Sequence, residues 1–293
     1  MTGGPVTLSL SKRGVRRAVA LRGIAALGAA ALGGCSPLVR AAERLHGCVD
    51  TKVPLASGMR VVRGVVPTRH VAGPVHYIMV VPESAHGLDA VAYLLPGRGG
   101  DAGAVLTIGM DGFLTEYLRG GGRPFAIAAL DAGESYFHPR TSGEDRLTVA
   151  TIDLPRIVRG LLGAQVLREA IMGQSMGGYG ALLAAERDPL RYRAVAVAGP
   201  AIFPSYEDEN HSVGDAFDSA ADYARYDVLA HAAALRGRPV HIAVGRRDPF
   251  LPGVRRFARA CPTAEVVEAA GCHDDGFWRT AAPAMLAFVG AHL

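Results

Sequence analysis

Ser175 lies in the segment Gly173-Gln174-Ser175-Met176-Gly177, which has the pattern Gly-x-Ser-x-Gly. An apolar run precedes the pattern and a helix-forming run follows it, as in the sharp strand-to-helix turn called a nucleophile elbow. The residues two positions on either side of the serine must be small, because strand and helix almost touch there. The pattern therefore predicts that Ser175 is a nucleophile facing a helix N-terminus, and a flexible glycine turn is the simpler alternative.

A serine hydroxyl needs a base to remove its proton, and the chain order expected with this elbow is serine, acid, histidine. His273 follows the last apolar run, in AAGCHDDGFW, and Asp248 follows the run before it, in VGRRDPF. We expect His273 to be the base and Asp248 the carboxylate that orients it. Asp274 and Asp275 are alternative acids that we expect to form a turn or a helix cap instead. Asp227 is a more remote alternative for the acid.

Acyl transfer also requires N–H donors for the developing oxyanion. The residue after the nucleophile, Met176, is expected to supply one donor, and the loop LLPGRGGDAG (94–103) the other, through the N–H of Arg98. The glycines of this loop lack the Lys-Ser/Thr ending of a phosphate-binding P-loop. The acidic run at 207–210 is expected to be a solvated loop, so we expect neither a metal nor an organic cofactor.

Apolar runs separated by turns or helical patterns must position these residues. The runs read as buried strands cover residues 75–82, 90–97, 124–133, 169–175, 193–200, 239–248 and 264–271, with a possible edge strand at 59–67. Helical patterns lie between them, which predicts an α/β fold with a mostly parallel sheet covered on both faces. We place this domain at residues 59–293, with a small cap insertion at about 202–234.

The basic residues are concentrated at the N-terminus. Five of the 31 Lys and Arg residues lie in the first 34 positions, which contain no acid, so the rest of the chain has 26 basic and 27 acidic residues. A nearly neutral body has no long-range field to attract a polyanion. We therefore expect no nucleic-acid binding.

Residues 1–34 have the form of an export signal: a basic stretch followed by a short apolar run. The run ends in Leu32-Gly33-Gly34-Cys35, which resembles a bacterial lipobox, and this resemblance implies cleavage before Cys35 and a lipid on its sulfur. We expect an enzyme anchored to the outer face of a membrane, with secretion as the alternative, and residues 35–58 as a tether. The pair at 16–17 partly resembles a twin-arginine signal, so the export route stays open.

Three further cysteines remain for an exported chain, in which a disulfide is allowed. The pair Cys261–Cys272 is the nearest in sequence and is our first expectation. A bond from Cys48 to either of them is the alternative.

The segments LLPGRGG, ALDAGESYFHP, GQSMGGYGAL, VGRRDP and GCHDDGFW occur in this order over residues 75–290. Together they resemble the esterase family of α/β-hydrolases that contains esterase D-like serine esterases and the secreted mycolyltransferases. The resemblance implies the α/β-hydrolase fold and places Ser175, Asp248 and His273 on the catalytic positions. It places Arg98 and Met176 at the oxyanion, and it implies that Tyr136 lines the substrate pocket.

The chain departs from this family at two positions. Pro96 stands before Gly97 where many relatives have histidine or aspartate, and Asp248 stands where the mycolyltransferases use glutamate. The second departure favours a hydrolase. We therefore expect a membrane-anchored serine esterase that acts on a small-molecule or lipid ester. An acyltransferase that passes the acyl group to a sugar or lipid alcohol is the alternative, and a non-catalytic ligand-binding lipoprotein is a more distant one.

Overall fold

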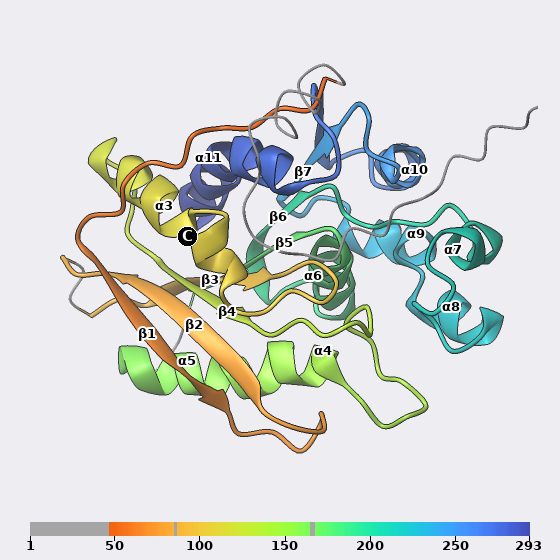
Figure 1. Ribbon diagram of the computed structural model, residues 1–293, viewed down its shortest axis with the longest axis horizontal. Helices are drawn as coiled ribbons and strands as arrows, with labels where there is room; N and C mark the ends of the chain where they lie inside the picture. The colour runs from red at the N-terminus through yellow and green to blue at the C-terminus, as the bar shows by residue number, and fades with distance from the viewer. Residues whose placement is uncertain (1–46, 85–86, 165–167) are drawn as a thin grey trace, which may run out of the picture.

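The computed structural model describes residues 47–84, 87–164 and 168–293. They form one eight-stranded sheet and the helices that pack on it (Figure 1). The strand order is β1-β2-β4-β3-β5-β6-β7-β8. β1 and β2 are antiparallel, as are β2 and β4, and the other neighbouring pairs are parallel. The predicted mostly parallel sheet is confirmed. The strands are β1 (Met59–Val66), β2 (Val75–Pro82), β3 (Ala90–Leu95), β4 (Ala126–Leu130), β5 (Arg168–Gln174), β6 (Tyr192–Ala198), β7 (Val240–Gly245) and β8 (Glu265–Ala269).

Helices cover both faces of the sheet, as the continuous apolar strands require. One face packs against α3 (Met110–Arg119) and α11 (Asp275–His292). The other packs against α5 (Leu154–Leu162), α6 (Met176–Arg187) and α10 (Leu251–Ala260). Every residue of β3 and β4 is buried between these two layers. Figure 1 shows α3 and α11 together on one side and α5 on the other.

Two of the expected helical patterns, at residues 104–121 and 145–163, are interrupted. The first divides into α2 (Ala104–Thr107) and α3 at Gly109, whose φ is +83° and whose missing side chain leaves room for Val53. The second begins with α4 (Arg146–Thr148) and continues through a π-helical turn (Val149–Asp153) into α5. Pro155 is the second residue of α5 and directly follows the π-helical turn.

The segment 202–234, expected to be a cap, follows β6 and contains α7 (Tyr206–Ser212), α8 (Ala220–Tyr226) and α9 (Val228–His231). A short 3₁₀ helix (Ala232–Leu235) then leads toward β7. Figure 1 shows α7 and α8 at one end of the molecule, beyond α9 and away from the sheet. The Arg140 side chain donates to Asp218 over 2.8 Å and so joins this segment to the loop after β4.

The expected Cys261–Cys272 disulfide is wrong, because Cys48 is bonded to Cys272 and Cys261 is a free, buried thiol. The strand β8, five residues long, lies between Cys261 and Cys272. It places the two cysteines at opposite ends of a strand about 17 Å long, farther than a disulfide can span. Closeness in sequence was therefore misleading here.

Among the described residues, no helix combines the length and the hydropathy that crossing a membrane requires. The expected export signal and Cys35 lie outside the described residues.

Candidate active site

Ser175 occupies a sharp turn between β5 and α6, with φ +54° and ψ −124°. A residue other than glycine rarely adopts positive φ, so the surrounding packing must hold this conformation. A Cβ on Gly177 would overlap the carbonyl of Leu95, and one on Gly173 would overlap the carbonyl of Gly177. Strand and helix therefore approach so closely that only glycine fits at both positions, as the sequence pattern predicts.

The structure brings Ser175, His273 and Asp248 together, although 98 residues separate the serine from the histidine along the chain. Nε2 of His273 lies 2.8 Å from Oγ of Ser175, and Nδ1 lies 2.8 Å from Oδ2 of Asp248. The serine follows β5, the aspartate follows β7 and the histidine follows β8. Because these strands run parallel, their carboxyl ends meet at the same edge of the sheet.

The Asp248 carboxylate is buried, and each of its oxygens has a partner. Oδ2 faces His273, and Oδ1 accepts the N–H of Phe250 over 2.8 Å. Gly199 lies beside the carboxylate and leaves room for it, because a Cβ there would come within 2.5 Å of Oδ2. A buried carboxylate is costly unless it is paired, so these contacts stabilise Asp248 and fix its orientation.

Two aromatic rings hold the His273 imidazole from its sides. The Phe250 ring centre lies 5.0 Å from that of the imidazole, and Trp278 meets it edge-on at 4.8 Å. Phe250 was not singled out from the sequence, and Trp278 entered only as the last residue of the segment GCHDDGFW. Its place in the first turn of α11, five residues after His273, is the sequence signal that points to its contact with the imidazole.

The alternative acids have other partners. Asp274 caps α11 by accepting the N–H of Phe277 over 2.9 Å, and Asp227 caps α9 by accepting the N–H of Leu229 over 2.8 Å. Asp275 is exposed in the first turn of α11, with Arg279 3.9 Å away. The expectation that Asp274 forms a helix cap is thus met, and of these four candidate acids Asp248 is the one that contacts Nδ1 of His273.

Two backbone N–H groups are available beside Ser175. Met176 is the first residue of α6, so its N–H has no partner within the helix. The loop after β3 lies against the serine, since a Cβ on Gly97 would be 3.5 Å from Cβ of Ser175. Over the part of the chain described, no acceptor in the protein takes the N–H of Met176 or of Arg98. Both predicted oxyanion donors are therefore free to serve a bound substrate.

The Arg98 side chain points to carboxylates rather than to the serine. It forms ion pairs with Glu134 at 3.1 Å and with Asp215 at 2.8 Å. The N–H of Gly99 donates to the carbonyl of Gly133 over 2.8 Å, which also fixes this loop. Arg98 thus joins the loop beside Ser175 to the segment after β6, a contact that the sequence did not reveal.

A cavity of about 440 Å³ opens beside Ser175 and His273. Three carboxylates line it, from Asp101, Asp274 and Asp275, together with Arg98. The Arg98 charge is already balanced by its two acidic partners, so the cavity presents net negative charge to a substrate. Its polar lining suits an alcohol or polyol better than an acyl chain.

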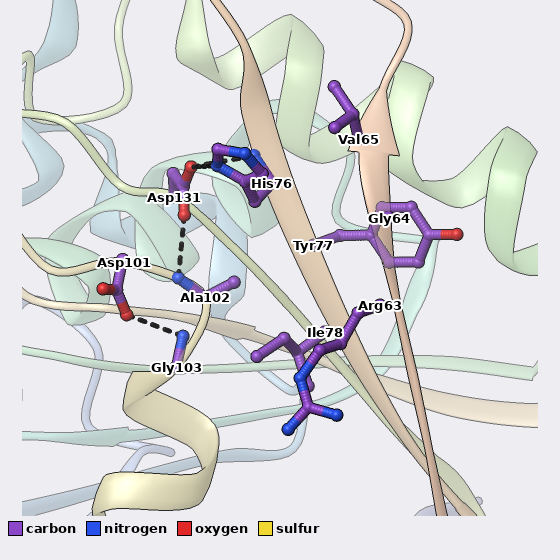
Figure 2. A pocket seen from close by; sticks show the side chains of 10 residues that line it. All are labelled: Arg63, Gly64, Val65, His76, Tyr77, Ile78, Asp101, Ala102, Gly103 and Asp131. Atoms are coloured by element: carbon purple, nitrogen blue, oxygen red, sulfur yellow. Dashed lines mark hydrogen bonds and ion pairs between the residues drawn. The ribbon is translucent and has the colours of Figure 1, made fainter.

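A second cavity, of about 480 Å³, lies between β1, β2 and the loop before α2, and Figure 2 shows the side chains that line it. It shares Asp101 with the first cavity but contains neither Ser175 nor His273. Its wall includes Asp131, which accepts hydrogen bonds from the backbone N–H of Ala102 at 2.9 Å and from His76. Burial alone would raise the pKa of Asp131, but these hydrogen bonds outweigh it and lower the pKa. Asp131 therefore fixes the loop that carries Asp101.

Tyr136, which the resemblance placed in the substrate pocket, does not line the cavity beside Ser175. It has φ +53° and is 2% exposed, and its ring packs against those of Tyr179 and Phe203 at 5.8 and 5.6 Å. Burial raises the pKa of its hydroxyl. A role for Tyr136 in substrate binding stays a prediction.

Comparison with known proteins identifies similar chains. Residues 120–285 match the family described as "Putative esterase". Mouse S-formylglutathione hydrolase is 30% identical over 125 residues, which are 40% of this chain and 44% of that protein, so less than half of the relative's length is matched.

Two solved structures have the same fold. A ferulic acid esterase aligns with a TM-score of 0.70 at 18% identity and covers 82% of this chain and 100% of its own. An S-formylglutathione hydrolase from Agrobacterium tumefaciens aligns with a TM-score of 0.67 at 18% identity, over 83% and 98% of the two chains. The α/β-hydrolase fold is confirmed by this likeness.

Proposed function

Since the chain belongs to the "Putative esterase" family, we propose that it hydrolyses carboxylic esters through an acyl-enzyme on Ser175. The observation that carries this proposal is the hydrogen-bonded series of Ser175 Oγ, the two nitrogens of His273 and Asp248 Oδ2, with both distances 2.8 Å. A nucleophile, a base and an orienting carboxylate in this arrangement can perform acyl transfer without a metal or an organic cofactor.

In the first half-reaction, Ser175 Oγ attacks the ester carbonyl carbon while Nε2 of His273 takes the hydroxyl proton. Asp248 holds Nδ1–H, so that Nε2 is the nitrogen free to accept this proton. The carbonyl oxygen becomes an oxyanion, which the N–H groups of Met176 and Arg98 stabilise. His273 then gives its proton to the departing alcohol oxygen, and the acyl group remains on Ser175.

In the second half-reaction, a water molecule attacks the acyl carbon and His273 again accepts a proton. Collapse of the oxyanion releases the carboxylic acid and returns the proton from Nε2 to Ser175 Oγ. The same acyl-enzyme could instead react with an alcohol, which would make the protein an acyltransferase. The polar cavity of about 440 Å³ beside Ser175 supports this second candidate, because it could hold an acceptor alcohol.

A fluorophosphonate probe tests the first proposal, since it labels a serine only when a base activates it. We expect labelling of the wild type and of the control Ser142→Ala, which changes a serine in an exposed turn, but not of Ser175→Ala. Labelling of Ser175→Ala would contradict the nucleophile assignment. A folded wild type that takes no label would favour a non-catalytic ligand-binding protein.

Product analysis separates the two catalytic candidates. A panel of nitrophenyl esters of increasing acyl length first identifies a good donor. Products are then measured with and without added trehalose or glycerol. A hydrolase gives free acid in both cases, whereas an acyltransferase forms the new ester at the expense of the acid.

We also propose that the protein is exported and anchored through a lipid on Cys35. The basic and apolar N-terminal pattern supports this, as does the Cys48–Cys272 disulfide, since structural disulfides persist in oxidising compartments. Metabolic labelling with a radioactive fatty acid tests it. We expect label in the membrane fraction for the wild type and none for Cys35→Ser, and export without label would support secretion instead.

A further inference from the structure

We propose that the Cys48–Cys272 disulfide positions His273, so that the enzyme reaches full activity only when this bond is oxidised. This inference depends on the proposed acyl-enzyme mechanism. Cys272 immediately precedes His273 in the loop between β8 and α11. The bond therefore holds the backbone one residue away from the imidazole that must contact both Ser175 and Asp248.

The partner cysteine begins an extended segment, residues 48–57, which we call the strap. The strap lies on α11, whose first residue comes just two positions after His273. Asp50 forms an ion pair with Arg279 at 3.1 Å, and Thr51 Oγ1 lies 2.9 Å from Thr280 Oγ1. The Val49 carbonyl lies directly on Gly276, where a Cβ would overlap it. The strap is thus fixed to the helix that follows the histidine.

The far end of the strap is fixed to α3. The N–H of Ser57 donates to Oγ1 of Thr115 over 3.1 Å, and that hydroxyl lies 3.2 Å from the Ser57 carbonyl. Val53 fills the space beside Gly109. Because both ends are held, the disulfide connects the histidine loop to a fixed part of the molecule rather than to a free terminus.

The residue before the strap adjoins the loop of the catalytic acid. A Cβ on Gly47 would lie 3.3 Å from Nε of Arg247, and Arg247 immediately precedes Asp248. The N–H of Arg247 in turn donates to the carbonyl of Gly271 over 3.0 Å. Residues 47–48 therefore contact the neighbours of both Asp248 and His273, and so they fix the spacing between the two loops.

Reduction breaks this connection. A dithiol reductant supplies two electrons and two protons, which yields the Cys48 and Cys272 thiols and a cyclic disulfide of the reductant. The loop then loses its covalent link, and a displacement of about 1 Å at His273 is enough to lower catalysis by up to about a hundredfold. Most residues that line the cavity beside Ser175 lie outside the histidine loop, at 96–108 and 174–175. Reduction should therefore lower kcat while KM changes little.

Cys261 does not share this role. It is fully buried in the hydrophobic core on the α10 side, where its Sγ lies 3.7 Å from Oγ1 of Thr263. Cys261→Ala is therefore a matched control that removes a thiol without touching the strap. Asp50→Asn is a second control, because it weakens one strap contact and keeps the disulfide.

The test compares kcat, KM and the rate of fluorophosphonate labelling in oxidised and dithiothreitol-treated protein. For the wild type we expect reduction to lower kcat and the labelling rate at least about tenfold, with KM within about twofold, and reoxidation to restore both. Cys48→Ala should resemble the reduced wild type and no longer respond to dithiothreitol. Cys261→Ala and Asp50→Asn should respond as the wild type does.

Trp278 supplies a readout at the histidine itself, because it is the single tryptophan of the chain and its ring meets His273 edge-on. We expect reduction of the folded wild type to change Trp278 fluorescence and its pH dependence in step with kcat. Wild-type kcat in Cys48→Ala, with only the melting temperature lowered, would overturn the proposal. Absence of labelling and turnover in the oxidised wild type would instead overturn the underlying esterase mechanism.

Discussion

Oδ2 of Asp248 lies 2.8 Å from Nδ1 of His273, and the Asp248 carboxylate is buried. A buried carboxylate that accepts Nδ1–H at this position selects the imidazole tautomer that leaves Nε2 able to accept the Ser175 proton. Replacing Asp248 should therefore affect the chemical step rather than substrate binding.

We expect Asp248→Asn to lower kcat by about 10⁴-fold with little change in KM, because an asparagine amide facing Nδ1 would favour the wrong tautomer. Steady-state kinetics on a nitrophenyl ester measures the effect. Asp227→Asn is the control, since Asp227 caps α9 without contacting His273. A larger loss of kcat in Asp227→Asn than in Asp248→Asn would reassign the acid.

Gly177→Ala should destabilise the fold by about 3 kcal/mol, because the added methyl group would overlap the backbone of β3 rather than a side chain that could move. Gly160→Ala is a matched control in α5, where a Cβ meets nothing within 4 Å. That control should be neutral or stabilise by about 1 kcal/mol. Urea unfolding measures both changes, and equal stabilities for the two variants would contradict the close approach of β3 and α6.

The charge of the alcohol should affect the rate of ester cleavage, because Asp101, Asp274 and Asp275 line the cavity beside Ser175. With acetyl esters of choline, glycerol and glycolate, we expect kcat/KM at low salt to be about tenfold lower for the anionic ester than for the cationic one. Added salt should reduce this ratio.

Neutralising variants test the origin of that preference. Asp101→Asn combined with Asp275→Asn should bring the cationic and anionic esters within a few-fold of each other, while the glycerol ester changes little. Glu207→Gln, which removes an exposed acid on α7, should leave the ratio unchanged. An unchanged ratio in the double variant would show that these carboxylates do not set specificity.

His241 should make the fold less stable at mildly acidic pH. Burial lowers its pKa, and Glu265, whose Oε1 lies 3.3 Å from Nδ1, only partly opposes this. The unfolded chain therefore binds a proton more readily than the folded protein as the pH falls below about 6.5, so stability is complete above that pH and decreases below it.

Melting temperatures at pH 7.5 and pH 5.5 measure this effect. We expect the decrease on acidification to be smaller by about 2 °C or more in His241→Leu than in the wild type. His211→Gln, a change on the exposed helix α7, should keep the wild-type pH dependence. Identical pH dependence in His241→Leu and the wild type would exclude this contribution.

The sequence was sufficient to predict the sheet and the meeting of three side chains. Ser175, Asp248 and His273 each follow an apolar run, and parallel strands bring such positions to one edge whatever their separation along the chain. The glycines around Ser175 carried information for the same physical reason, since only close backbone contact requires them.

The contacts that escaped prediction join segments without a repeating pattern. The Cys48–Cys272 bond spans 224 residues, and the strap has no helical or strand periodicity to show which surface it covers. The Arg98 ion pairs with Glu134 and Asp215 likewise depend on two loops that meet only in the folded chain. Tyr136 was placed by family resemblance alone; its ring packs against those of Tyr179 and Phe203, and its role in substrate binding stays a prediction.

The position of Cys48 beside the active site also affects which esters the enzyme would meet. With a lipid on Cys35, only about a dozen residues would separate the bilayer from Cys48, a spacer whose full extension is about 45 Å. Cys48 is bonded to Cys272, next to the catalytic histidine. This spacer would therefore hold the side of the molecule that carries the active site, and not the opposite side, within roughly one protein diameter of the lipid surface. Esters embedded in or attached to that surface would then meet the serine at a far higher local concentration than esters free in solution.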